Sequence, residues 1–358
     1  MIRKKVGIIG ATGMVGQRFI LLLEKHPWFE ITALAASSRS AGKTYQQCME
    51  NRWCMDEPIP KHIEKMNMLD ASNIAQVSQK VDFIFCAIDI PKSEICALEQ
   101  AYAQAECPVI SNNSAHRMTA DVPMIIPEIN VQHLDVIPFQ KKRLGTQKGF
   151  IAVKSNCSLQ SYVPALHPLH QIFNMTHCLV CTYQAISGAG KTFSSWPEMQ
   201  DNCIPFIEGE EEKSEQEPLK IWGSIQNGII TPANNPKITA QCVRVPCSDG
   251  HMTAVFATFQ QKPTKQQILT LWRTYQGAPQ LLALPSAPKQ FLHYFEQENR
   301  PQTKLDRNIE QGMAISIGRL REDHQYHYKF ISLSHNTLRG AAGGAVLLAE
   351  LLYAKGYL

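Results

Sequence analysis

The sequence predicts an α/β protein, with an N-terminal Rossmann-type doubly wound parallel sheet followed by an α+β domain whose mixed sheet is largely antiparallel. Three observations support this class. A short apolar run at 4–9 ends in glycines before a helical pattern. Strand-like and helix-like segments then alternate, and longer alternating strands follow after about residue 155. We expect a first domain over 1–155, completed by a C-terminal helix over 337–358, and a second over 156–336.

Composition limits the classes of partner that we expect for this 358-residue chain. The net charge of +4 is mild and dense Lys/Arg clusters are lacking, so we expect no nucleic-acid partner. We expect no membrane span, because no apolar run reaches about 18 residues. The start runs straight into a strand pattern rather than a signal peptide. The eleven cysteines follow no disulfide framework, which indicates free thiols in a reducing cytoplasm.

Glycines follow the first predicted strand in "GATGMVGQRF". Gly10, Gly13 and Gly16 are spaced by three residues before a helix whose apolar face we expect to carry Phe19, Leu22 and Leu23. Such glycines let backbone N–H groups approach a pyrophosphate at a helix N-terminus. The pattern predicts a dinucleotide site, although glycine triplets also occur in simple turns. Its candidate cofactor-binding residues are Gly10, Thr12, Gly13, Met14 and Val15.

The second predicted strand ends in "SSRSAGK" without the Asp or Glu that would bind a ribose 2′-hydroxyl. Cationic and hydroxyl side chains there fit a 2′-phosphate, which favours NADP over NAD. The alternative is that Arg39 and Lys43 belong to a solvated loop. The candidate residues are Ser37, Ser38, Arg39, Ser40 and Lys43.

Further strands are predicted along both halves. A buried strand at 81–88 precedes a helical stretch, and "PVISNNS" follows as another strand. In the second half, "CLVCTYQAISG", "ITAQCVRVP" and residues 253–260 alternate as antiparallel strands do. Cys178 and Cys181 have redox-motif spacing, but they lie in an apolar strand pattern without the turn and helix start of such motifs. We expect both to be core thiols.

Cys157, in "IAVKSNCSLQ", stands between a loop and a possible helix start. A helix N-terminus lowers the pKa of a thiol, so this cysteine is the candidate nucleophile. The local sequence alone leaves the structural interpretation equally open.

Two residues outside this loop could assist such a nucleophile. His251 follows a Ser-Asp-Gly turn at the start of a strand, where it could relay protons. Arg244 could bind a carboxylate through two hydrogen bonds. The rival histidines, His167 and His170, lie within a helical pattern without a third metal ligand, so we expect no metal site.

Taken together, these motifs resemble the aspartate-β-semialdehyde dehydrogenases, specifically the branch found in archaea and fungi. The resemblance spans nearly the whole chain in the family's order. The matching stretches are "GATGMVGQRF", "SSRSAGK", "VPMIIPEIN", "SNCS", "TYQAISGAG", "GEEEK", "CVRVPCSDGH" and "HNTLRGAAGGAVLLAELL".

The resemblance implies the NADPH-dependent reductive dephosphorylation of L-aspartyl 4-phosphate to L-aspartate 4-semialdehyde, a step of lysine, threonine and methionine biosynthesis. Cys157 would form a thioester, His251 would act as acid/base, and Gln184 would orient the acyl group. Arg244 would hold the substrate α-carboxylate and Glu210 its ammonium. The first domain would bind NADP, while the second would catalyse and dimerise.

The resemblance also implies phosphate and nicotinamide contacts. Phosphate would lie on Arg117 and Lys213, with Asn112 and Asn156 donating hydrogen bonds. "NNSAHRM" departs from the family pattern and leaves open which of Ser114, His116 and Arg117 meets phosphate; we favour Arg117 for its fixed charge. The residues expected beside the nicotinamide are Ser187, Gly188, Gly190 and Asn336.

Three alternatives remain at this point. A malonyl-CoA reductase would share the scaffold, but malonyl has no ammonium for Glu210 to pair with. A reductase of N-acetylglutamyl phosphate matches the motifs less well. A non-catalytic NADP-binding regulator would keep the two domains without the chemistry. In each case the extended second sheet predicts a homodimer or homotetramer.

Overall fold

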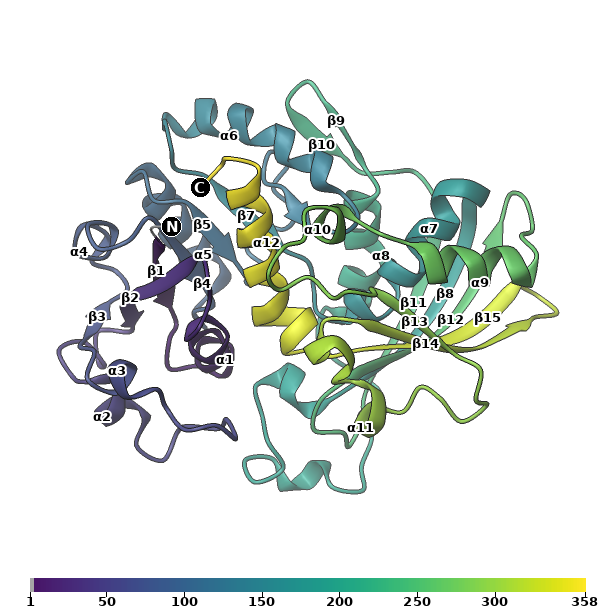
Figure 1. Cartoon of the computed structure of the whole chain (residues 1–358), viewed down its shortest axis with the longest axis horizontal. Helices are drawn as coiled ribbons and strands as arrows, with labels where there is room; N and C mark the ends of the chain where they lie inside the picture. The colour runs from purple at the N-terminus through teal and green to yellow at the C-terminus, as the bar shows by residue number, and fades with distance from the viewer. Residues whose placement is uncertain (1–2) are drawn as a thin grey trace.

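The computed structural model describes residues 3–358, and its N-terminal part is built on a seven-stranded sheet (Figure 1). All neighbouring strands in this sheet are parallel, and the order is β3-β2-β1-β4-β5-β7-β6. The predicted doubly wound sheet is therefore confirmed. Its strands are β1 (Lys4–Ile9), β2 (Phe29–Ala36), β3 (Met68–Asp70), β4 (Phe83–Cys86), β5 (Val109–Ser111), β6 (Met124–Ile125) and β7 (Ile151–Lys154).

The first helix, α1 (Met14–Leu23), follows β1 through the glycine turn. A Cβ on Gly16 would lie 2.3 Å from the Gly10 carbonyl oxygen, so only glycine lets the helix pack this closely on the turn. The buried face carries Phe19, Ile20 and Leu23; Leu22, which the sequence placed there, is only half-buried. The other helices of this part are α2 (Tyr45–Met49), α3 (Lys61–Glu64), α4 (Ile74–Ser78), α5 (Lys92–Gln104), the 3₁₀ helix η1 (Val131–Val136) and α6 (Ile137–Leu144).

The second part is built on a six-stranded mixed sheet in the order β11-β8-β12-β15-β14-β13. Its central pairs, β8–β12, β12–β15 and β15–β14, are antiparallel, and the outer pairs are parallel. The mixed, largely antiparallel prediction is thus confirmed. Its strands are β8 (Met175–Gln184), β11 (Lys237–Arg244), β12 (His251–Phe259), β13 (Leu292–Phe295), β14 (Ile315–Glu322) and β15 (Tyr328–Ser334).

Helices cover one face of this sheet, and short elements connect its strands (Figure 1). The larger helices are α7 (Val163–Phe173), α8 (Glu210–Ile221) and α9 (Lys265–Thr274). The shorter elements are the hairpin β9 (Ser224–Gln226) and β10 (Ile229–Thr231), the helices α10 (Ala278–Leu281) and α11 (Thr303–Asp306), and the 3₁₀ helices η2 (Ser158–Ser161), η3 (Ile186–Ala189), η4 (Pro197–Met199) and η5 (Ile309–Gly312).

Several strand-level predictions need correction. The strand expected over 81–88 is shorter, β4, and the strand expected over 253–260 begins earlier, at His251. Cys178 is buried, but Cys181 is only half-buried, so just one of the two is a core thiol. The reason is strand geometry: side chains three positions apart point to opposite faces of β8.

The C-terminal helix α12 (Gly343–Ala354) lies between the two parts of the molecule, where Figure 1 shows it in yellow. It continues from the π-helical turn η6 (Leu338–Ala342). Its side chains are buried nearly all round and share an apolar cluster with strands β1, β4 and β7 of the first sheet. Glu350 also bonds His26 of the loop after α1, with 2.8 Å between Oε1 and Nε2. The exact domain boundary near residue 155 stays a prediction.

No helix within residues 3–358 combines the length and the apolar character that a membrane crossing needs.

An almost fully buried ion pair links the C-terminal segment to the end of the first sheet. Arg339, in η6, donates from Nη1 to Glu128 Oε1 over 2.7 Å, and its Nε donates to Gln160 over 2.9 Å. Its guanidinium also lies 4.6 Å from the ring centre of Phe291. Since both charges are withdrawn from water, each depends on the other for solvation.

Breaking this pair from one side should be more harmful than removing it altogether. We expect Arg339→Met to lower the free energy of unfolding by about 3–5 kcal/mol, because it leaves Glu128 charged and unpaired. The double variant Arg339→Met/Glu128→Gln should lose less than the sum of the two single variants. Urea unfolding of all four proteins measures the coupling, and strictly additive losses would contradict it.

Candidate active site

Cys157 lies where the first sheet meets the second part of the molecule. It follows β7 by three residues and is the N-cap residue of η2. The C-terminal segment covers it: a Cβ on Gly340 would lie 2.9 Å from Cys157 Cβ. The fold therefore holds the thiol against η6, and a larger residue at Gly340 would displace it.

His251 is the histidine that faces this thiol. As the first residue of β12, it brings Nε2 to 3.4 Å from Cys157 Sγ. The backbone N–H of Ala185 donates to Nδ1 over 3.1 Å. Because Nδ1 is thereby an acceptor, the neutral ring carries its proton on Nε2, which points at the sulfur.

The pKa values of this pair differ from what a helix N-terminus would give. Burial raises the pKa of the Cys157 thiol, and Glu210 raises it further, whereas Lys154, Arg117 and Arg244 act in the opposite direction. The sequence interpretation, a thiol with its pKa lowered by a helix N-terminus, is therefore wrong. The adjoining helix is only the four-residue η2, and the α-helix α7 starts at Val163.

Burial also lowers the pKa of His251 well below its usual value, with Arg244 and His335 adding to the effect. The ring is fully buried at the entrance of the strand. The imidazole is therefore neutral at physiological pH and presents its Nε2 proton to the thiol.

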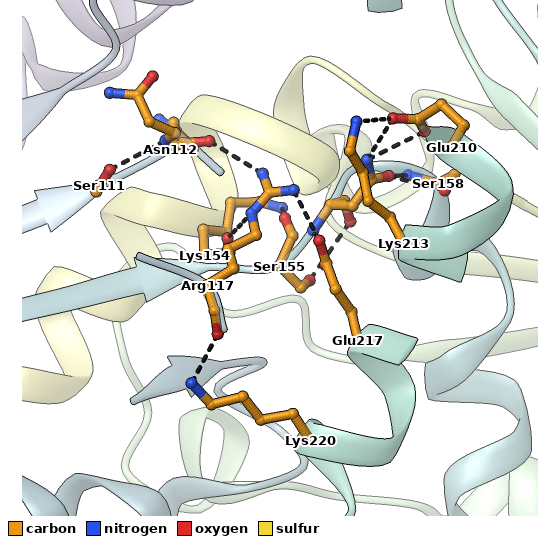
Figure 2. Close-up of polar contacts among 12 residues, drawn as sticks. Ser111, Asn112, Arg117, Lys154, Ser155, Ser158, Glu210, Lys213, Glu217 and Lys220 are labelled. Carbon is orange, nitrogen blue, oxygen red and sulfur yellow. Dashed lines mark hydrogen bonds and ion pairs between the residues drawn. The ribbon is translucent and has the colours of Figure 1, made fainter. Parts of the chain in front are cut away.

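A buried carboxylate, Glu210 at the start of α8, gathers the polar side chains near the thiol. Asn156 Nδ2 donates to both of its oxygens, over 2.8 and 3.0 Å, and Gln184 Nε2 donates over 3.1 Å. Lys213 Nζ lies 2.9 Å from Oε1 (Figure 2). Residues from three separate elements thus meet at one carboxylate, and only Lys213 among them reaches solvent appreciably.

Arg244, at the end of β11, lies on the other side of His251. Its Nη1 donates to the Ala185 carbonyl over 2.7 Å. A Cβ on Gly188 would lie 2.9 Å from Arg244 Nη1 and 3.0 Å from the His251 ring, so this glycine leaves the space that both side chains occupy.

Arg117 is committed to contacts inside the protein. Its Nη1 pairs with Glu217 over 3.0 Å, and its other nitrogens donate to the carbonyls of Lys154 and Asn112 (Figure 2). Both partners of the pair are almost fully buried. Its role as a phosphate ligand stays a prediction, and this pairing weighs against it.

Asn112 has free hydrogen-bonding capacity. Among the described residues, neither amide atom of this side chain has a partner, although both are shielded from water. His116, in contrast, bonds Thr119 Oγ1 and the Cys96 carbonyl through its two ring nitrogens. Of these polar side chains, Asn112 is therefore the one prepared to bind an incoming group.

A cavity of about 730 Å³ opens beside the glycine turn, at the carboxyl ends of β1 and β2. Seven of the predicted cofactor residues line it, whereas Met14, Val15 and Ser38 lie outside the lining. Arg39, Lys43 and Arg52 give it positive charge, which fits a phosphorylated dinucleotide. The predicted residues in its lining are Gly10, Thr12, Gly13, Ser37, Arg39, Ser40 and Lys43.

Three residues expected beside the nicotinamide lie near His251 instead of in this cavity lining. Asn336 donates from Nδ2 to Ser187 Oγ over 2.8 Å, and its Oδ1 accepts from the Gly250 backbone N–H over 2.8 Å. Gly188 contacts the His251 ring. These residues therefore lie beside His251, and their cofactor role stays a prediction.

Several residues at these two sites were not predicted from sequence patterns. Glu217 and Lys220 belong to the charged helix α8, yet both are buried: Glu217 accepts from the Asn156 backbone N–H, and Lys220 donates to the Arg117 carbonyl. Gln47 and Arg52 line the cofactor cavity from a segment without any motif. Lys154 offered one signal, a charge that ends the otherwise apolar strand "IAVK".

Comparison with known proteins gives the family. Models of the semialdehyde dehydrogenase NAD-binding domain and dimerisation domain match residues 5–137 and 166–339. The chain is 41% identical to an aspartate-semialdehyde dehydrogenase of Methanothermobacter thermautotrophicus, over 97% of this chain and 98% of the relative. It is 40% identical to that of Schizosaccharomyces pombe, with 99% of each chain covered. The chain belongs to the aspartate-semialdehyde dehydrogenase family.

Solved structures agree with this aspartate-semialdehyde dehydrogenase assignment. The enzyme of Candida albicans, determined with NADP, superimposes with a TM-score of 0.89 at 37% identity, and the alignment covers both chains fully. An aspartate-semialdehyde dehydrogenase II of Vibrio cholerae shares the fold, with a TM-score of 0.76 at 23% identity. The resemblance to the archaeal and fungal branch is thereby confirmed, and the regulator alternative is set aside.

The charge of the cofactor cavity can be tested with two nucleotides. We expect Arg39→Ala to weaken NADPH binding by about tenfold, because a charge-assisted contact to the 2′-phosphate is lost. NADH lacks that phosphate and should bind equally well to both proteins. Fluorescence titration measures the two affinities. Equal losses for NADPH and NADH would show that Arg39 does not face the 2′-phosphate.

The neutrality of His251 can be tested by NMR. Because the folded-state pKa is well below the ordinary value of about 6.5, its ring signal should not titrate as the pH falls through that value. Free histidine in the same sample serves as the reference. A His251→Gln variant assigns the signal, and a midpoint equal to that of the free amino acid would contradict the prediction.

Proposed function

We propose that Cys157 carries the reaction of this family in this chain, the reductive dephosphorylation of L-aspartyl 4-phosphate to L-aspartate 4-semialdehyde. The observation that supports the proposal best is the 3.4 Å contact between Cys157 Sγ and His251 Nε2. Both residues are also bordered by groups suited to an amino-acid substrate, Glu210 and Arg244. The cofactor is NADP(H).

The substrate would lie between the carboxylate and the guanidinium. Glu210 offers negative charge to the α-ammonium, while Arg244 offers a planar cation to the α-carboxylate. Gln184, bonded to Glu210, would hold its amide beside the acyl group. These opposite charges would select an amino-acid substrate over a malonyl group, which has no ammonium.

Two polar side chains of this site remain available to the phosphate group of the substrate. Lys213 is the cation of this group that remains partly exposed, and the unpartnered amide of Asn112 could donate to a phosphate oxygen. Asn156 is less free, because its Oδ1 accepts from Ser158 N and Oγ and its Nδ2 donates to Glu210. We therefore propose Lys213 and Asn112 as the main phosphate ligands.

The chemistry begins with the Cys157 thiolate attacking the acyl carbon. A carbon–sulfur bond forms, the carbon–oxygen bond to phosphate breaks, and phosphate leaves with the electron pair and takes up one proton. His251 would steady the negative charge through its Nε2 proton. When bound, NADPH supplies the hydride that reduces the thioester. The carbon–sulfur bond of the resulting thiohemiacetal then breaks, which releases the aldehyde and restores the thiolate.

We also propose how the protein assembles and where it works. The second part contains the family's dimerisation domain, and the uncovered face of its sheet carries half-exposed residues at alternate positions of β8 and β12. A homodimer or homotetramer built on this face is the expected assembly. All eleven cysteines are free thiols, which fits a cytoplasmic location.

Replacing the proposed nucleophile tests the function directly. We expect Cys157→Ala to abolish turnover and to keep NADPH binding, because the cofactor cavity does not include this residue. The assay follows NADP reduction with aspartate semialdehyde plus phosphate, and Cys181→Ala serves as the matched thiol control.

The same assay with malonate semialdehyde plus CoA measures the competing reaction. We expect reduction of NADP with the first pair of substrates only. Turnover by Cys157→Ala, or a signal with the malonyl pair alone, would refute the proposed chemistry.

A further inference from the structure

Lys154 is a buried lysine that the reaction as described does not use. It is the last residue of β7, three positions before Cys157, and its exposed fraction is 2%. Among the described residues its ammonium has one hydrogen-bond partner, the Ser155 carbonyl at 3.0 Å (Figure 2). An ammonium carries three donors, so two remain unsatisfied by the protein's own hydrogen bonds.

Lys220 shows what a purely structural lysine looks like in the same region. It is 1% exposed, and its Nζ donates to the carbonyls of Arg117, Thr119 and Val122 over 2.6, 2.7 and 2.9 Å. All three of its donors are used. Burying Lys154 as a cation is costly without a comparable set of acceptors, so its charged form depends on a nearby negative charge.

The carboxylates near Lys154 are already paired. Glu217 binds Arg117 through Oε1 and the Asn156 backbone N–H through Oε2. Glu128, farther along, is paired with Arg339. Arg117 and Arg339 are committed to these two carboxylates, so among the ionisable groups that act on Lys154 only Cys157, once ionised, is an anion without a committed cation.

The C-terminal segment packs against both Cys157 and Lys154. A Cβ on Gly340 would lie 2.9 Å from Cys157 Cβ, and one on Gly344 would lie 2.8 Å from Lys154 Cε. Both glycines belong to one continuous stretch of η6 and α12. Because neither Gly340 nor Gly344 has a side chain, this segment leaves space for both the thiol and the lysine.

His251 does not provide the positive charge that a thiolate needs. Its Nδ1 accepts the Ala185 N–H, so an imidazolium would have to break that bond. Burial keeps its pKa low as well. The ring can donate a hydrogen bond to the sulfur, but it cannot readily take up the thiol proton while this contact persists.

We propose that Lys154 is a positioning residue of this site, whose buried ammonium pairs with the Cys157 thiolate and keeps it ready for attack. The proposal rests on the proposed nucleophilic role of Cys157. Burial lowers the pKa of Lys154 to about 7, and Cys157 acts to raise it. Lys154 in turn lowers the pKa of Cys157. Its effect is the largest among the cations, and it opposes burial and Glu210, which raise that pKa.

The experiment measures the ionisation of Cys157 in variants that remove the charge. Lys154→Gln keeps a donor for Ser155, whereas Lys154→Met removes charge and donor together. Alkylation by iodoacetamide is followed as a function of pH by mass spectrometry of the Cys157 peptide. In both variants we expect the apparent pKa of Cys157 to rise by about one unit, with alkylation at pH 7 slowed about tenfold.

Lys220→Met is the matched buried-lysine control. It should lower the melting temperature, because three carbonyls lose their donor, and leave the alkylation profile of Cys157 unchanged. Lys154→Met should melt no lower than wild type at pH 7, since a poorly solvated charge is removed. This contrast separates an electrostatic role from a structural one.

A second measurement needs no variant. Two ionisable groups that interact strongly titrate in two linked steps, so the wild-type alkylation profile should deviate from a single titration curve. A single-step wild-type profile, or unchanged profiles in the Lys154 variants, would overturn the proposal. Turnover by Cys157→Ala would instead overturn the proposed nucleophile, so the two failures are distinguishable.

Discussion

Charged side chains at the junction of the two parts are almost fully withdrawn from water, and the surrounding structure is arranged to compensate them. Arg339 with Glu128 fixes the C-terminal segment, and Arg117 with Glu217 fixes the loop before the thiol. Neither pair needs to add much net stability, because desolvation offsets most of the attraction. Each pair does make its partners interdependent. The junction therefore has one arrangement in which its charges are satisfied, and the thiol is held within it.

The same withdrawal from water determines how the thiol is ionised. Burial opposes the thiolate, and it also opposes an imidazolium at His251. His251 is therefore neutral, and its Nε2 proton is directed at the sulfur of Cys157. In the proposed arrangement the thiolate is stabilised by a neighbouring cation, and Lys154 is the lysine whose own hydrogen bonds leave it available. Activation of the nucleophile is thus a property of the junction as a whole.

Much of the fold and of the cofactor site was predicted from patterns of residues close together in the sequence. The glycine turn required close backbone approach, and Gly16 against Gly10 shows that contact. The missing acidic residue after β2 indicated NADP, and Arg39 and Lys43 do line the cofactor cavity. Cys157, His251, Gln184 and Glu210 came from the family resemblance together with their local settings. For Arg117 a fixed charge suggested a phosphate ligand; its buried partner Glu217, a hundred residues away in the chain, weighs against that role and could not be seen in a local pattern.

By itself, the sequence determined the two sheets and the cofactor turn, because each depends on residues close together in the chain. Only the tertiary structure decided which charges are paired and which are left free. Lys154 and Lys220 are both almost fully buried, yet Lys220 has three carbonyl partners and Lys154 has one. Desolvation and pairing depend on atoms brought together from distant segments, and that information is absent from any local pattern.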